Sequence, residues 1–212
     1  FFVAGEFNRN ITPSTNHPGS GASALTLYEA ESISERYKAL TGYDGGGWWE
    51  HKVAAITGSA VARLDWNIDH DNHMSLRYNM LHADAHDSAN SLQSFYFTGA
   101  EYTNINRTHS VVAELNSSLN KRLWMNNTAR IGYTRLKDGR TTPESLPAVI
   151  INGLGERENG SATIGTNPYS GRNMLIQDVF IFGDDLTFTL GSNHDITVGT
   201  SNEIYRADNL YM

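Results

Sequence analysis

Apolar and polar residues alternate along several stretches of this chain. In residues 60–68 every second residue is apolar, and Arg63, Asp65 and Asn67 stand between the apolar ones. A period of two places the two sets on opposite faces of a β-strand. The same alternation predicts seven strands, which include residues 1–7, 60–68, 74–80, 111–119, 129–133, 186–190 and 196–204.

Short and long connections between these strands follow one another in strict alternation. Residues 69–73, 120–124 and 191–194 are tight turns, whereas residues 10–59, 84–106 and 138–173 are long excursions. Loops of that length are unusual in a compact soluble domain. A transmembrane β-barrel has short periplasmic turns and long extracellular loops. The predicted fold class is therefore all-β, an antiparallel transmembrane β-barrel segment of about seven long strands that forms an incomplete barrel.

The two faces of the predicted strands suit such a barrel. The strands run to about 9–14 residues, near the length that a tilted strand needs to cross a bilayer. Aromatic residues lie near the positions of interfacial girdles, at Trp66, Tyr78, Trp124, Tyr133 and, with inward parity, Tyr205. The opposite, polar face predicts a lumen-facing wall made of Arg63, Asp65, Arg77, Asn79, Glu114, Asn116 and Arg130, continued by Asp185, Thr187 and Glu203.

The first long connection contains a helical pattern and an aromatic segment. Apolar residues from Leu27 to Leu40 approximate a helical stripe that ends at Gly42. The following "YDGGGWWE" carries Tyr43, Trp48 and Trp49, a candidate platform for a ligand. The alternative is a folded loop that packs its own aromatic side chains.

Histidine and aspartate are concentrated in residues 69–87. "DHDNH" forms a predicted turn, where Asp and Asn are favoured by turn geometry. His82, Asp84 and His86 follow at the far end of the next strand and share one face if it stays extended, so they are weak candidates for a metal site. The other histidines, His17, His51, His109 and His194, are isolated in the sequence and are expected to be solvated.

Composition and motifs exclude several classes of function. The 212 residues carry a formal net charge of −7 and no cysteine, so disulfide scaffolds, zinc-thiolate sites and thiol catalysis are excluded, and no nucleic-acid partner is expected. No nucleophile elbow, His-Glu-x-x-His motif or P-loop occurs, so we expect no enzyme activity and no cofactor. Both ends read as extended strands, without a signal peptide, and look cut from a longer chain.

Several stretches resemble a known family. "VARLDWNIDHDNHMSLRYNML", "HSVVAELNSSLNKRLWMNNTARIGYTRLKD", "GTNPYSGRNMLIQDVFIFGDDLTFTLG" and "GSNHDITVGTSNEIYRADNLYM" are similar to the barrel of TonB-dependent outer-membrane receptors of the Bacteroidetes-type, Oar-like branch. The resemblance implies that residues 1–212 are part of one receptor barrel domain, without the plug, the TonB box and the closing strands of the 22-stranded barrel.

The same resemblance implies a location and a task. It implies the bacterial outer membrane and the uptake of a scarce nutrient, driven through TonB by the inner-membrane proton gradient. Its implied partners are the TonB complex, through parts outside this chain, outer-membrane lipid, a nutrient ligand and a surface lipoprotein. The alternatives are a soluble β-sandwich that binds a carbohydrate-type ligand through "YDGGGWWE", and a metal-dependent surface enzyme that uses His82, Asp84 and His86.

Overall fold

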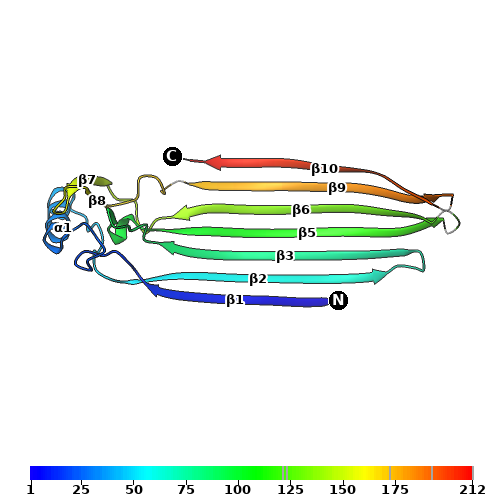
Figure 1. The fold of residues 1–212 in the computed structure, drawn as a ribbon, viewed down its shortest axis with the longest axis horizontal. Helices are drawn as coiled ribbons and strands as arrows, with labels where there is room; N and C mark the ends of the chain where they lie inside the picture. The colour runs from blue at the N-terminus through cyan, green and yellow to red at the C-terminus, as the bar shows by residue number, and fades with distance from the viewer. Residues whose placement is uncertain (121, 123, 172, 192, 212) are drawn as a thin grey trace.

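The computed structural model describes residues 1–120, 122, 124–171, 173–191 and 193–211. The fold is all-β, with 62% of the residues in strands and one α-helix, and its main element is a seven-stranded antiparallel sheet (Figure 1). The strand order is β1-β2-β3-β5-β6-β9-β10. These strands are β1 (Phe2–Pro13), β2 (Lys52–Asn67), β3 (Asn72–Asp87), β5 (Tyr102–Asn120), β6 (Met125–Thr141), β9 (Met174–Leu190) and β10 (His194–Leu210).

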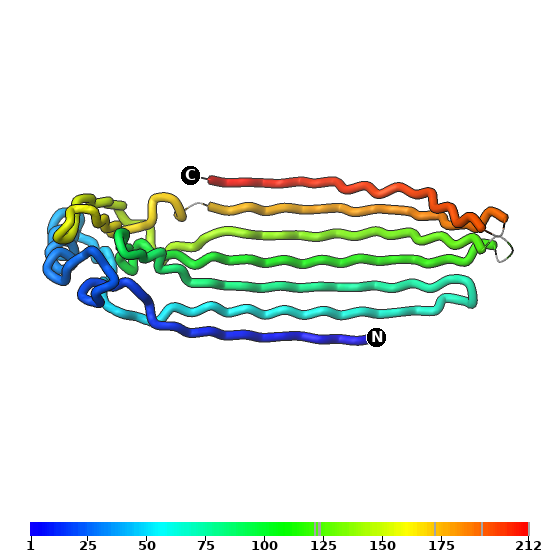
Figure 2. The backbone as a smooth tube through the Cα atoms, in the orientation of Figure 1, coloured from blue at the N-terminus to red at the C-terminus, as the bar shows by residue number. Residues whose placement is uncertain are grey.

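The sheet is open. Its two edges are β1 and β10, and the chain ends lie at these opposite edges (Figure 2). The prediction of an all-β chain with seven antiparallel strands is confirmed. Closure into a barrel is not seen, because β1 and β10 do not pair with each other within the described residues.

β1, with 12 residues, has the predicted length of 9–14 residues, and the other six strands are longer, at 16–19 residues each. β5 begins at Tyr102 and β3 continues to Asp87, well into what the sequence pattern assigned to a long loop. In these extensions both faces carry polar residues, so the hydrophobic alternation stops while the backbone ladder continues. The short turns lie where the pattern placed them, although parts of two of them fall outside the described residues.

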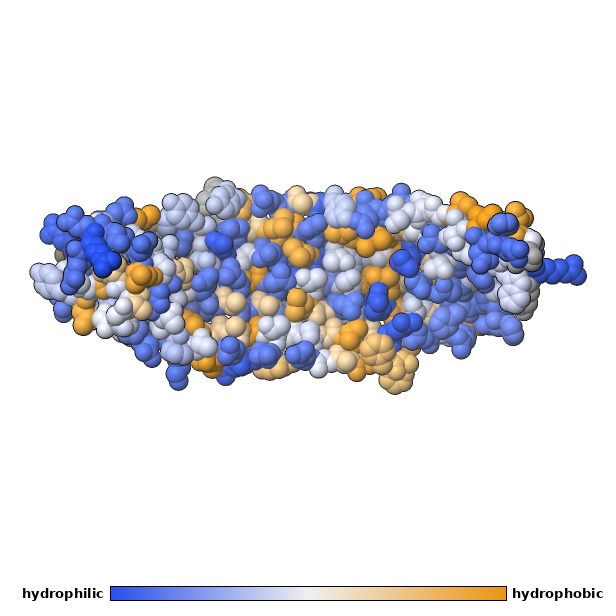
Figure 3. Space-filling model, in the orientation of Figure 1, coloured by the Kyte–Doolittle hydropathy of each residue, from blue (hydrophilic) through white to orange (hydrophobic). Residues whose placement is uncertain are grey.

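The register aligns apolar residues into rows on one face of the sheet, which we call the apolar face. One row crosses all seven strands, through Val3, Ala62, Tyr78, Val111, Tyr133, Phe180 and Ile204. Asp184 also lies on this face and accepts a hydrogen bond from Asn127 at 2.7 Å. Figure 3 shows one side of the molecule, with hydrophobic groups spread over the middle of the sheet.

The long connections fold together beyond one end of the sheet. This loop cap comprises residues 14–51, 88–101 and 142–171, and it contains α1 (Leu27–Thr41), β4 (Ser94–Tyr96), the 3-10 helix η1 (Thr98–Ala100), β7 (Val149–Leu154) and β8 (Gly160–Ile164). β8 pairs with β4 in parallel and with β7 in antiparallel orientation. The buried hydrophobic cluster of the chain lies here, and it comprises Leu25, Ala30, Tyr37, Phe95, Phe97, Ala162 and Ile164.

The predicted helix in the first connection is confirmed. Thr26 caps α1, and Glu29 completes a capping box in which each side chain bonds to the backbone of the other. The helix ends at Gly42, whose φ of 76° suits a residue without a Cβ atom. Burial raises the pKa of the Glu29 carboxyl, but hydrogen bonds from Thr26 and Gly155 together lower it by more, so the pKa lies below its ordinary value of 4.5. Among the described residues, no helix is long and apolar enough to cross a membrane.

Candidate functional site

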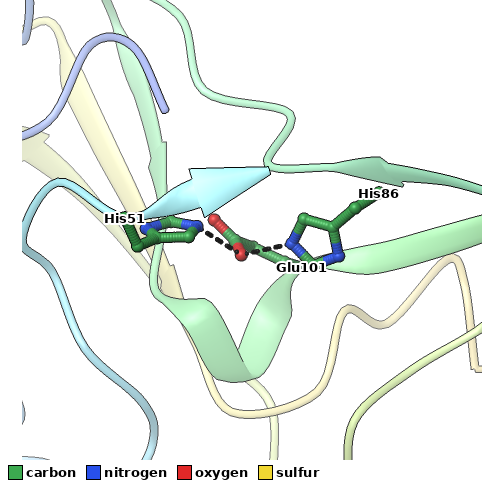
Figure 4. Close-up of side chains that lie close together, drawn as sticks. All are labelled: His51, His86 and Glu101. Carbon is green, nitrogen blue, oxygen red and sulfur yellow. Dashed lines mark hydrogen bonds and ion pairs between the residues drawn. The ribbon is translucent and has the colours of Figure 1, made fainter. Parts of the chain in front are cut away.

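Three side chains meet where the first and second long connections return to the sheet. His51 directly precedes β2, His86 stands at the end of β3, and Glu101 lies between η1 and β5. β2, β3 and β5 are neighbours in the sheet, so the ends of these strands bring the three residues to one rim. Figure 4 shows both imidazole rings directed toward the Glu101 carboxylate. We call this group the rim cluster.

The carboxylate is the centre of the rim cluster. Glu101 Oε2 accepts hydrogen bonds from His51 Nε2 at 3.0 Å and from His86 Nε2 at 2.8 Å. The Glu101 side chain is only 2% exposed, whereas the two histidines are about one quarter exposed at 22% and 27%. The hydrogen bond with Glu101 raises the pKa of His86; burial opposes this, and the charges of Glu101 and Asp87 add to it, so the pKa lies above its ordinary value.

Two further contacts define the polar environment of the cluster. His51 Nδ1 lies 3.2 Å from the carbonyl oxygen of Trp49 and 3.3 Å from the hydroxyl oxygen of Ser14. That hydroxyl oxygen also accepts the backbone N–H of His51 at 3.0 Å. Glu101 Oε1 is buried and has no hydrogen-bond partner among the described residues. Such an atom is costly unless a further group satisfies it.

The predicted set of His82, Asp84 and His86 does not converge on one point. His82 Nε2 lies 3.1 Å from His109 Nε2, and Asp84 accepts a hydrogen bond from Arg107 at 2.5 Å. Side chains two residues apart on one strand face are spaced by the strand rise, so each meets the neighbouring strand instead of the others. The metal prediction is corrected accordingly: of the three residues, only His86 belongs to a potential ligand set among the described residues.

The expectation that His51 and His109 are solvated is wrong. His51 joins the rim cluster, and His109 contacts His82 and also Tyr78, whose hydroxyl lies 2.7 Å from His109 Nδ1. Both histidines are isolated in the sequence, but strand pairing brings partners from distant segments to them. The sequence offered no signal for Glu101, which lies in a long connection without periodicity.

The aromatic segment after α1 is divided between the core and the surface of the loop cap. Trp48 packs against the hydrophobic cluster. The ring of Trp49 contacts the ring of Trp48 edge to face, with the two centroids 6.2 Å apart. Tyr43 and Trp49 are exposed and line a cavity of about 340 Å³ together with Asp44 and Glu144. Two of the three predicted platform residues therefore face a shared hollow.

The predicted wall residues all lie on the face opposite the apolar face. In the register Arg63 stands opposite Arg77, Ser75 opposite Glu114, and Glu114 opposite Arg130, and the remaining members follow with the same parity. Glu114 accepts a charged hydrogen bond from Arg130 at 2.9 Å and a hydrogen bond from Asn116 at 3.1 Å. Arg63 pairs with Asp65 at 2.8 Å. That this polar face lines a lumen stays a prediction.

Comparison of the chain with protein-family models, with curated proteins and with solved structures found no match. The functional assignment below therefore depends on the sequence patterns and on the geometry described above.

Proposed function

We propose that this chain forms part of the barrel wall and the extracellular loops of a TonB-dependent transporter in the bacterial outer membrane. The observation that carries the proposal is the apolar face of the sheet. Its large side chains are uncovered, with exposed fractions of 73% for Val3, 60% for Trp66, 50% for Phe180 and 58% for Ile204. Monomeric soluble proteins rarely expose a continuous apolar surface that spans a whole sheet. We infer that lipid covers this face.

Two tyrosines lie where the apolar part of this face gives way to charged residues, about midway along their strands, and they support a lipid boundary there. The Tyr133 hydroxyl donates a hydrogen bond to Asp178 at 2.6 Å, while its ring packs in a tilted arrangement against Phe180 with centroids 4.9 Å apart. The Tyr78 hydroxyl lies 2.7 Å from His109 Nδ1, and the two rings are stacked with centroids 6.2 Å apart. Tyrosine with an apolar ring and a polar tip is the side chain that interfacial girdles prefer. Closer to the loop cap the same face carries charged side chains, and Arg135 forms an ion pair with Asp178 at 3.5 Å.

The position of the connections supports an orientation. The turns after β2, β5 and β9 are short and lie together at one end, while the loop cap gathers the long connections at the other. In outer-membrane barrels the long loops are extracellular. The polar face would then border the lumen, and the loop cap would meet the nutrient or a surface lipoprotein. Energy coupling through the TonB complex is part of the proposal on the strength of the family resemblance.

Single-cysteine labelling tests both the membrane location and the orientation, because the chain has no cysteine of its own. In the intact protein in cells, with no other accessible cysteine, Tyr28→Cys on the loop cap should react with a membrane-impermeant maleimide from outside. His70→Cys in the first turn should react only after permeabilisation. Both positions are highly exposed, so their intrinsic accessibility is matched. Equal labelling of both in intact cells would contradict the proposed orientation.

A second candidate function is capture of a carbohydrate-type ligand by a soluble module. It is favoured by the exposed Tyr43 and Trp49 around one cavity, since aromatic faces pack well against sugar rings. The three-stranded sheet lies beyond the end of the large sheet and does not cover either of its faces (Figure 1). A soluble sandwich would need such a cover. Monodisperse behaviour of the protein without detergent, with oligosaccharide binding lost in Trp49→Ala and kept in Tyr169→Ala, would favour this candidate over the transporter.

A further inference from the structure

We propose that His51, His86 and Glu101 bind a divalent cation of the zinc class at the junction between the loop cap and the sheet. The inference is independent of membrane location and goes beyond the transporter proposal. The three residues come from three separate segments, and each offers one ligand atom within 4.8 Å of the other two. Two imidazoles and one carboxylate are a ligand set that suits zinc and leaves a fourth position open.

The carboxylate of Glu101 lies close to both imidazole nitrogens, and all three ligand atoms are within 4.8 Å of one another. Zinc bonds of about 2.0–2.2 Å place the ligands of one tetrahedral ion roughly 3.3–3.6 Å apart. The two contacts of Glu101 Oε2 with the imidazole nitrogens, at 3.0 and 2.8 Å, are already shorter than this separation. An ion would replace the two Nε2 protons and move the carboxylate outward by a few tenths of an ångström.

The unpartnered oxygen of Glu101 is an independent indication of a missing cation. Glu101 is 1% exposed, and its Oε1 atom has no hydrogen-bond donor among the described residues. A buried carboxylate oxygen without a donor is costly. A cation bound by this carboxylate would neutralise its charge, and coordination by both oxygens would give Oε1 a partner.

The contact of His51 with Trp49 fits a metal ligand. A carbonyl oxygen only accepts, so the 3.2 Å contact places a proton on His51 Nδ1, and the Ser14 hydroxyl oxygen at 3.3 Å can then only accept from that nitrogen. When an ion replaces the proton that Nε2 donates to Glu101, the Nε2 lone pair becomes the metal ligand while Nδ1 keeps its proton. Metal-bound histidines characteristically donate their second ring N–H to a backbone carbonyl or a carboxylate. An ion between Nε2 and the carboxylate would satisfy both groups.

An ion at this position would have a structural role. His51 ends the first long connection and Glu101 ends the second, while His86 lies at the end of β3, just before the second begins. A shared ion would therefore fasten both connections to the rim formed by β2, β3 and β5. We expect ion binding to protect the loop cap against local unfolding, since a ligand stabilises the state that binds it.

The pair of His82 and His109 is the competing site and serves as the matched control. Its two Nε2 atoms lie 3.1 Å apart, close enough to share an ion, and it lies on β3 and β5 further from the loop cap than the rim cluster. It has no carboxylate ligand among the described residues, because Asp84 is engaged by Arg107. His109→Asn removes this pair and leaves the rim cluster unchanged.

The test is a zinc titration of the purified protein after chelator treatment, with a chromogenic indicator as competitor. The protein with its natural sequence should bind one ion more per chain than the His86→Ala and Glu101→Gln variants, or should bind it at least tenfold more tightly. The His109→Asn variant should match the natural sequence. Equal binding in all four proteins overturns the proposal, and so does a loss confined to His109→Asn.

A second measurement keeps the proposal testable if a variant does not fold. Cobalt(II) added to the unaltered protein should give the intense visible absorption of a tetrahedral site, and zinc should displace it. Zinc should also raise the unfolding midpoint of the unaltered protein and leave that of His51→Asn unchanged. No visible cobalt band and no shift of the midpoint in the unaltered protein would overturn the proposal without recourse to Glu101→Gln.

Discussion

An arginine at position 131 distinguishes a lipid-covered sheet face from a water-exposed one. Ile131 lies in β6 on the apolar face, between Ala113 of β5 and Phe182 of β9, and it is 65% exposed. On a surface in water, Ile131→Arg should change the free energy of unfolding by no more than about 0.5 kcal/mol. At the middle of a bilayer the same substitution should cost about 2–4 kcal/mol.

The dimensions of β6 place Ile131 near the middle of the proposed apolar band. The strand takes ten residue steps from Met125, where it begins, to Arg135, the first charged residue on this face toward the loop cap. At about 3.4 Å per residue and a tilt of about 40°, these steps span about 26 Å along the membrane normal, close to the ~25 Å band of outer-membrane barrels. Ile131 lies about 10 Å from Arg135 in this direction, so the upper part of the cost range applies.

The assay is reversible denaturant unfolding of the protein in phospholipid vesicles. Ser201→Arg is the matched control, because Ser201 is an exposed residue of β10 on the polar face. We expect a loss of about 2–4 kcal/mol for Ile131→Arg and no more than about 0.5 kcal/mol for Ser201→Arg. Equal effects of the two substitutions would refute the assignment of the faces to lipid and lumen.

Three predictions concern the loop cap. Gly165 and Gly21 both have positive φ, so substitution by alanine should cost about 1–2 kcal/mol of cap stability at either position. Only at Gly165 would the added Cβ collide with the Pro147 carbonyl, which should add about 1–3 kcal/mol. Hydrogen exchange of the cap measures both costs. Because the pKa of Glu29 is lowered in the folded state, its contribution to the stability of α1 is present above pH 4.5 and is lost as the pH falls through the folded pKa. Glu29→Gln should therefore remove this acid dependence from the hydrogen-exchange protection of α1, and an unchanged pH profile would contradict the assignment. Phe97→Ala should cost about 3–5 kcal/mol in the cap, because the side chain is fully buried, and resistance of the cap to limited proteolysis should fall accordingly.

The sequence predicts those features of the fold that depend on local pattern. Alternation identifies the seven strands, and the stripe before Gly42 identifies the helix, because side-chain periodicity follows directly from backbone geometry. Strand ends are predicted poorly for the same reason. Around Tyr102 and Asp87 neither face is apolar, so no periodic signal marks a ladder that backbone hydrogen bonds continue to hold.

The rim cluster shows where prediction from sequence stops. The sequence identifies His86 as a candidate ligand, but its pattern pairs it with neighbours on the same strand. The actual partners, His51 and Glu101, are 35 and 15 residues away and meet it through strand pairing. Register and strand length determine which loop residues share a rim, and neither is encoded in the spacing of a short motif.

The loop cap and the seven-stranded sheet differ in how far they bury their own apolar side chains. The loop cap buries its own cluster around Phe97 and Ile164, so it has the elements of an independent core. The seven-stranded sheet buries no comparable cluster, and its cohesion within the described residues comes from its hydrogen-bond ladders and from pairs such as Arg130 with Glu114. A sheet of this kind needs an external cover for its apolar face, whereas the cap does not. The rim cluster lies at the boundary between these two parts, so an ion bound there would couple the order of the cap to the sheet that carries it.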